Sequence, residues 1–139
     1  MNITIIDGQG GQLGAQLIKS ISSSFPSANL TAVGTNSVAT ATMLKAGAKY
    51  AATGENPVIV ACRNADIIIG PVGIVIADSL LGEITEKMAV AVGQSRAVRL
   101  LIPMNKCDNI IAGVPNLNVG ALVEDAILKL RSIIDARNS

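Results

Sequence analysis

Short apolar runs alternate with segments of helical periodicity along this chain, and this alternation constrains the fold more than any other feature. Nearly continuous apolar runs predict strands at residues 2–6, 29–34, 48–52, 66–70, 98–102 and 109–113. Helical spacing predicts helices at residues 12–22, 37–46, 57–64, 83–93 and 118–136. Apolar strands that alternate with helices are typical of a parallel sheet covered on both faces.

The predicted fold class is therefore α/β, with a doubly wound parallel sheet of about six strands in a three-layer αβα arrangement. The chain has 139 residues, a length that fits one domain. No linker, repeat or low-complexity segment interrupts the pattern, so residues 1–139 are predicted to form a single nucleotide-binding domain, for the reasons that follow.

The composition excludes several classes of function. The chain has no His and no Trp, and it has one Tyr and one Phe. His is the commonest general base and metal ligand, so its absence removes much ordinary acid–base and metal chemistry. A net charge of +1 and the scarcity of aromatic rings argue against nucleic acid as a partner. The two cysteines are too few for a disulfide framework, and no cluster has zinc-ligand spacing, so no metal site is predicted.

The N-terminal segment and the longest apolar run indicate a protein outside the membrane. The apolar start at residues 3–6 is short and ends at Asp7, unlike a signal peptide. The longest apolar run, residues 67–77, contains glycines and a proline and is shorter than the roughly 20 residues that span a bilayer. We expect a soluble, reduced, cytoplasmic protein without a membrane partner.

A glycine-rich segment joins the first predicted strand to the first predicted helix. Its sequence is DGQGGQLG, residues 7–14. It departs from the common G-x-G-x-x-G spacing. It matches G-x-x-G-x-x-G through Gly8, Gly11 and Gly14, or G-x-G-x-x-x-G through Gly8, Gly10 and Gly14. Both variants resemble loops of dinucleotide-binding Rossmann domains, so the sheet is predicted to be Rossmann-like.

Each glycine has an expected role in such a loop. Gly8 permits the tight turn, Gly10 and Gly11 let backbone N–H groups approach a pyrophosphate, and Gly14 lets the helix pack closely on the strand. The free N–H groups and the helix dipole favour anionic oxygen. The predicted phosphate site comprises Gly8, Gln9, Gly10, Gly11, Gln12 and Leu13. Gly11→Val is expected to fill this site while leaving the fold largely intact. The alternative is a tight turn with no nucleotide.

The end of the second predicted strand departs from the usual dinucleotide pattern. An acidic residue there normally binds ribose hydroxyls, but this chain has the neutral segment Gly34-Thr35-Asn36-Ser37. The neutral side chains Thr35, Asn36 and Ser37 would tolerate a 2′-phosphate, although no Arg is present to clamp it. The predicted cofactor is NADP or NAD, with a slight preference for NADP. Asp7 beside the loop is expected to accept loop N–H bonds, or alternatively to hold a metal or a ligand hydroxyl.

Two later segments are predicted to reach the same edge of the sheet. Gly70, Pro71 and Val72 follow the fourth strand and are expected to border the second half of the cofactor through backbone groups. Lys106 follows the fifth strand and is a candidate acid or anion anchor, or a solvated loop charge. Cys107 is a candidate nucleophile without a His to activate it, or a packed thiol.

Several other residues have expected roles in the fold. Asp78 and Ser79 are predicted to cap the following helix, and Glu83 is placed within that helix to pair with Lys87. Tyr50 is predicted to be structural.

Two further expectations concern burial and association. Cys62 is predicted to be helical and buried. The run from residue 72 to residue 81 is very apolar for a loop, so it is expected to form a substrate-side wall or a dimer surface. A homo-oligomer is expected because a minimal Rossmann unit needs a second chain to close a catalytic site.

Three groups of residues carry a resemblance to a known family. They are residues 7–11, residues 70–77 with 81–85, and residues 102–105 with Cys107. Over its whole length the chain resembles a small bacterial family of uncharacterised proteins, catalogued as a domain of unknown function. The resemblance implies a Rossmann-like NAD(P)-binding fold and no established activity, so it carries over no catalytic residue.

Three functions follow from these observations. The first is a small nucleotide- or dinucleotide-binding protein without a reaction of its own. The second is a homodimeric NAD(P)-dependent oxidoreductase in which Lys106 or a carboxylate supplies the proton. The third is an interaction module that retains only the fold. The first is favoured because the glycine loop is well placed while acid–base residues are scarce.

Overall fold

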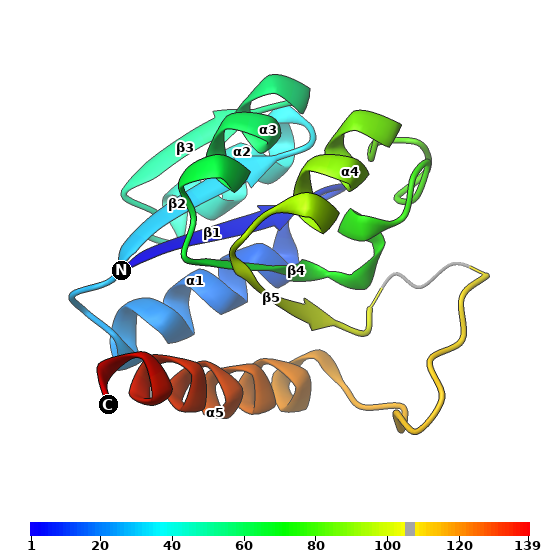
Figure 1. Cartoon of the computed structure of the whole chain (residues 1–139). Helices are drawn as coiled ribbons and strands as arrows, with labels where there is room; N and C mark the ends of the chain where they lie inside the picture. The colour runs from blue at the N-terminus through cyan, green and yellow to red at the C-terminus, as the bar shows by residue number, and fades with distance from the viewer. Residues whose placement is uncertain (105–107) are drawn as a thin grey trace.

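A computed structural model describes residues 1–104 and 108–139. Its strands are β1 (Asn2–Asp7), β2 (Asn29–Gly34), β3 (Tyr50–Thr53), β4 (Ile67–Pro71) and β5 (Val98–Ile102). Its helices are α1 (Gln12–Ser24), α2 (Ser37–Lys45), α3 (Glu55–Asn64), α4 (Glu86–Gln94) and α5 (Val119–Asn138), with a short 3-10 helix, η1 (Val72–Val75), after β4. The strands are all parallel and lie in the order β3-β2-β1-β4-β5 (Figure 1). The predicted α/β class and three-layer Rossmann-like arrangement are confirmed.

The position of β1 at the centre of the sheet explains why its sequence is apolar. It pairs with β2 along its whole length and with β4 from Ile3 to Ile5. Ile3, Ile5 and Ile6 have no exposed surface. Because successive strand residues point to opposite faces, a strand covered on both faces needs apolar side chains at adjacent positions.

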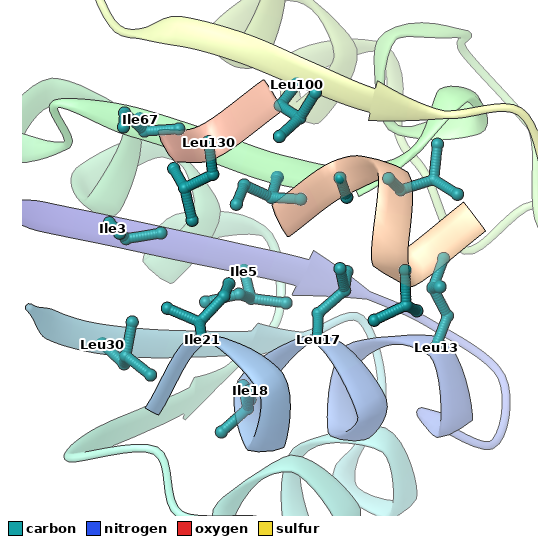
Figure 2. Packing of buried hydrophobic residues seen from close by; sticks show 14 of the residues in the cluster. Ile3, Ile5, Leu13, Leu17, Ile18, Ile21, Leu30, Ile67, Leu100 and Leu130 are labelled. Carbon is teal, nitrogen blue, oxygen red and sulfur yellow. The ribbon is translucent and has the colours of Figure 1, made fainter. Parts of the chain in front are cut away.

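Helices α1 and α5 cover one face of the sheet. Figure 1 shows both helices on one side of the sheet, with α3 and α4 on the other. Leu17 and Ile21 of α1 and Leu130 of α5 are fully buried against β1 and its neighbours (Figure 2). Burial of each such side chain contributes about 1.5–3 kcal/mol.

Helices α3 and α4 form the core of the opposite face. Val58 of α3 and Val92 of α4 have no exposed surface and pack with Ile6 and Ile68 of the sheet. Cys62 of α3 is 4% exposed, as predicted.

The segment 109–113 is not a strand, so the described part of the sheet has five strands rather than six. Ile110 in this segment is 95% exposed. The physical reason is the connection: a further parallel strand needs a crossover of about a dozen residues or more, and too few residues separate Ile102 from this segment. Figure 1 shows residues 108–118, which precede α5, lying away from the body of the domain.

No helix within residues 1–104 and 108–139 is long and apolar enough to cross a membrane.

Candidate functional site

The carboxyl ends of β1, β2 and β4 meet at one edge of the sheet. β1 and β4 are neighbours although β2 and β3 lie between them in the sequence, so the strand order reverses there. In doubly wound sheets, ligands bind outside the carboxyl ends of the strands at such a reversal. This edge is therefore the candidate site.

The glycine loop, residues 8–11, carries the chain from β1 into α1. Gln9 has φ of 51° and Gly11 has φ of 75°, both in the left-handed region. The N–H of Gly11 donates to the carbonyl of Gly8 at 3.0 Å, and the carbonyl of Gly11 accepts the first helical bond from Ala15 at 2.9 Å. Gly11 is thus the N-cap of α1, in a conformation that suits glycine.

Gly11 packs against α2, whereas Gly10 faces open space. A Cβ at Gly11 would lie 2.8 Å from both the Cα and the carbonyl oxygen of Ala39. The nearest atom to a Cβ at Gly10 would be 4.0 Å away. The expectation that Gly11→Val leaves the fold largely intact is therefore wrong, because the new side chain would strike the backbone of α2. Gly10 is the loop position where a side chain would fill open space.

The other two glycines also have packing reasons. A Cβ at Gly8 would lie 2.9 Å from Cδ1 of Leu80, so the loop after η1 touches the glycine loop. A Cβ at Gly14 would overlap the sulfur of Met43 and would lie 3.0 Å from Cβ of Asp7. The predicted close approach of α1 to β1 at Gly14 is confirmed, and α2 shares in it.

Asp7 holds the glycine loop from beneath. Its Oδ1 accepts from the N–H of Gly8 at 2.9 Å and its Oδ2 accepts from the N–H of Gly14 at 2.8 Å. The predicted role as acceptor of loop N–H groups is confirmed. Asp7 is 3% exposed, and this burial raises the pKa of its carboxyl. The charge of Glu83 raises this pKa further, and the two hydrogen bonds oppose the rise.

Glu83 is the residue of this site that the sequence did not reveal. It was expected within a helix beside Lys87, but α4 begins at Glu86. Its Oε1 instead accepts three hydrogen bonds: from the N–H of Gln9 at 3.0 Å, from Oγ1 of Thr35 at 2.5 Å and from Nδ2 of Asn36 at 2.7 Å. A carboxylate therefore lies at the end of β2, and the prediction of a neutral rim is wrong.

All three of these bonds converge on one oxygen of Glu83. Its Oε2 has no hydrogen-bond partner among the described residues. Burial alone would raise the pKa of Glu83, but the hydrogen bonds from Thr35, Gln9 and Asn36 together lower it. The side chain is thus a fixed carboxylate with one oxygen held and one oxygen open.

Asn36 ties the end of β2 to the glycine loop. Its Oδ1 accepts from the N–H of Ala39 at 2.9 Å, which caps α2. Its Nδ2 donates to the carbonyl of Gln9 at 2.9 Å as well as to Glu83. Ser37 begins α2 and is exposed. The structure therefore brings Thr35 and Asn36 to the glycine loop, as the Rossmann-like arrangement requires.

The connection between η1 and α4 presents Glu83 through a strained turn. Asp78, Leu80 and Leu81 have φ of 66°, 56° and 56°, and Gly82 has φ of 87°. Left-handed backbone costs roughly 1–2 kcal/mol for each non-glycine residue. Leu80 is 1% exposed and packs in the core, whereas Leu81 is 91% exposed. The apolar run is thus partly exposed, and Leu81 is its exposed large apolar side chain.

Asp78 and Ser79 do not cap α4, contrary to expectation. The cap is Thr85, whose side chain accepts from the N–H of Met88 at 3.2 Å. The hydroxyl of Ser79 instead donates to the carbonyl of Gly73, and the N–H of Asp78 donates to the carbonyl of Ile84 at 2.7 Å. These bonds close the connection on itself.

Gly70, Pro71 and Val72 lie at the carboxyl end of β4, next to the end of β1. A Cβ at Gly70 would overlap the carbonyl oxygen of Ile6, so this glycine permits close contact between the two strands. Pro71 is buried and Val72 is half-buried. They border the site, as their position after β4 predicts.

Backbone donors remain open at the start of α1. Gln12 and Leu13 are the first two residues of α1, so their N–H groups have no acceptor within the helix. Neither they nor Gly10 donate an N–H bond to any other described residue. These three N–H groups and the helix dipole favour an anionic oxygen.

The structure does not place every predicted residue at this site. Lys106 and Cys107 lie outside the described residues, so their roles stay predictions, as does a homo-oligomer. Tyr50 is 56% exposed on the edge strand β3, at the opposite end of the sheet. Within residues 1–104 and 108–139, no cluster of three His, Cys, Asp or Glu side chains is placed to hold a metal ion.

A family model described as a domain of unknown function, DUF3842, matches residues 2–135. The chain belongs to this family. No curated protein and no solved structure matches the chain. The match covers the glycine loop, Glu83 and all five described strands, so the whole candidate site lies within the DUF3842 region.

Proposed function

We propose that this DUF3842 protein binds a nucleotide with a free ribose 2′-hydroxyl, NAD in preference to NADP, at the carboxyl edge of its sheet. The observation that carries the proposal is the carboxylate of Glu83 at the end of β2, with Oε1 held by three donors and Oε2 open. In dinucleotide-binding domains a carboxylate at this place accepts from ribose hydroxyls. Here the carboxylate comes from the connection before α4.

The glycine loop supplies the second part of the proposed site. The open N–H groups of Gly10, Gln12 and Leu13 would bind the phosphates at the start of α1. A Cβ at Gly10 would meet no atom closer than 4.0 Å, so a phosphate can approach the backbone there. Gly70, Pro71 and Val72 would then border the far half of a dinucleotide, at the reversal of strand order.

Glu83 also decides between the two cofactors. A 2′-phosphate would lie against a carboxylate whose lowered pKa keeps it ionised near neutral pH. The like charges repel, so the slight preference for NADP that a neutral rim suggested gives way to a preference for NAD. The same reasoning admits ATP or AMP, which also carry a free 2′-hydroxyl.

The test is a thermal-shift titration with NAD, NADP, AMP, ATP and flavins. A ligand at 100 times its dissociation constant stabilises the fold by about 2.7 kcal/mol. For a domain of this size that corresponds to a rise in Tm of roughly 5–10 °C. NAD is expected to raise Tm at lower concentration than NADP. A panel in which no nucleotide raises Tm would refute the proposal.

Two variants separate the phosphate and ribose parts of the site. Gly10→Val is expected to abolish the shift with NAD while leaving the Tm of the free protein nearly unchanged, because its side chain enters open space. Glu83→Gln is expected to reduce the preference for NAD over NADP at least tenfold, because it removes the charge and keeps an acceptor. An unchanged preference in Glu83→Gln would contradict the ribose role of Glu83.

A further inference from the structure

A second cavity lies at the other end of the sheet from the glycine loop. It has a volume of about 630 Å³, within the usual range for small-molecule sites. Its floor is the first half of β1, alternate residues of β2 as far as Val33, and Tyr50 and Ala52 of β3. Its wall is one side of α3, including Pro57, Val60 and Ala61. It shares no residue with the glycine loop, with Thr35 and Asn36 or with Glu83.

Polar side chains from two paired strands line the floor of this cavity. Asn2 and Thr4 of β1 lie in register beside Asn29 and Thr31 of β2, and all four line the cavity. Asn2 and Asn29 are exposed at the starts of their strands and hydrogen-bond to each other at 3.2 Å, whereas Thr4 is buried and Thr31 is half-buried. On the opposite face of the same strands, the alternate positions are buried apolar residues, among them Ile3. The two threonines therefore place hydroxyl groups on the inner part of the cavity floor.

Thr4 is the buried member of this polar floor. It is 3% exposed, and its hydroxyl has no hydrogen-bond partner among the described residues. No side-chain polar atom in the described part of the chain is both buried and unpartnered, so this hydroxyl reaches the cavity it lines. The Thr4 hydroxyl is therefore open to whatever fills the cavity, and a hydroxyl group of a ligand there could hydrogen-bond to it.

The remaining lining groups indicate the chemistry of that ligand. Thr31, Tyr50 and Asn56 offer hydroxyl and amide groups, which both donate and accept and so match ligand hydroxyls. Among the described residues that line the cavity, Lys49 is the charged one, and its Nζ lies 5.2 Å from the centroid of the Tyr50 ring. No carboxylate side chain is among those lining residues, so one negative charge on the ligand is favoured.

We propose that this cavity binds a sugar acid, a small polyhydroxylated molecule with one carboxylate. Its hydroxyls contact Thr4 and Thr31, its carboxylate pairs with Lys49, and its apolar face lies against α3. This site is separate from the nucleotide site, since the two share no residue.

Three probes separate the contributions of charge and hydroxyls. Glucuronate carries both features, glucose has the hydroxyls alone, and cyclohexanecarboxylate has the charge alone. Titrations of the full chain followed by amide chemical shifts in two-dimensional NMR are expected to show glucuronate binding at least tenfold more tightly than either other probe. The shifts should fall on residues 4, 31 and 50 and spare residues 8–14. Absence of glucuronate-induced shifts at residues 4, 31 and 50, or equal binding of all three probes, overturns the proposal.

Matched variants test the roles of Thr4 and Lys49. Thr4→Val keeps the shape and removes the hydroxyl, so it is expected to weaken glucuronate binding at least fivefold while changing the Tm of the free protein by less than about 2 °C. Lys49→Met is expected to remove the preference for glucuronate over glucose. The control is Thr42→Val, whose hydroxyl bonds to the carbonyl of Val38 on its own helix at 3.0 Å and lies outside the cavity. If Thr4→Val lowers Tm and binds glucuronate like the natural chain, Thr4 is structural and the proposal fails.

Discussion

Replacing Gly11 with Ala tests whether the glycine loop is held by α2. Gly11 has φ of 75°, a conformation that costs an alanine roughly 1–2 kcal/mol. The added Cβ would also lie 2.8 Å from two backbone atoms of Ala39. Backbone cannot move aside as a flexible side chain does, so this overlap adds about 1–3 kcal/mol. The expected loss is therefore about 2–5 kcal/mol in the free energy of unfolding.

The assay is urea unfolding followed by far-ultraviolet circular dichroism, because the chain has no Trp for fluorescence. A loss of this size lowers Tm by roughly 5–15 °C for a domain of this length. The matched control is Gly10→Ala, whose Cβ would meet no atom closer than 4.0 Å. It is expected to change the free energy of unfolding by less than about 0.5 kcal/mol.

The comparison of the two variants can refute the reasoning. A loss below about 1 kcal/mol in Gly11→Ala would show that the contact with Ala39 yields easily. An equal loss in Gly10→Ala would show that both glycines are needed for the turn itself. In either case the assignment of Gly11 to packing against α2 would be wrong.

Three further changes have definite expected outcomes. Because the pKa of Glu83 is below its ordinary value of 4.5, its ionised form stabilises the fold above that pH. The natural chain should therefore have a higher free energy of unfolding than Glu83→Gln, by under about 1 kcal/mol for this partly exposed group. In urea titrations this difference should vanish as the pH falls through the lowered pKa. Leu81→Gly should raise the free energy of unfolding by up to about 1 kcal/mol, because the residue is left-handed and 91% exposed; a loss of stability would show that Leu81 has a packing role. Burial raises the pKa of Cys62 to about 11, so peptide mass spectrometry should find its alkylation at pH 8 at least about a hundredfold slower in the folded than in the urea-unfolded chain.

Most of the fold follows from local patterns. The runs at 2–6 and 66–70 are apolar because β1 and β4 are covered on both faces, and this local signal needs no knowledge of distant residues. The run at 109–113 has the same local character, yet the chain that precedes it is too short for a parallel crossover. The length of the preceding connection is what distinguishes the run at 109–113 from the runs that form parallel strands.

The candidate site could be predicted where its residues directly follow a strand of the sheet. The glycine loop and the acceptor role of Asp7 follow from their position after β1. Glu83 reaches Gln9 across 74 positions, and no spacing rule connects them. One local signal was available: Thr85 followed by Glu86 is a favoured helix start, which would have placed Glu83 before the helix and left it free for another role.

The environments of the four loop glycines bear on how DUF3842 sequences diverge. Gly8, Gly11 and Gly14 each meet neighbouring atoms that a methyl group would strike, and at Gly11 these atoms belong to the backbone of α2, so packing alone is a reason to retain Gly11. Gly10 meets none, so nothing in the fold forbids a larger residue there. A relative that keeps the other three glycines but has a bulky residue at position 10 would inherit the architecture without the phosphate site. If the proposed nucleotide site is correct, position 10, rather than the glycine pattern as a whole, would distinguish members that bind from members that only fold.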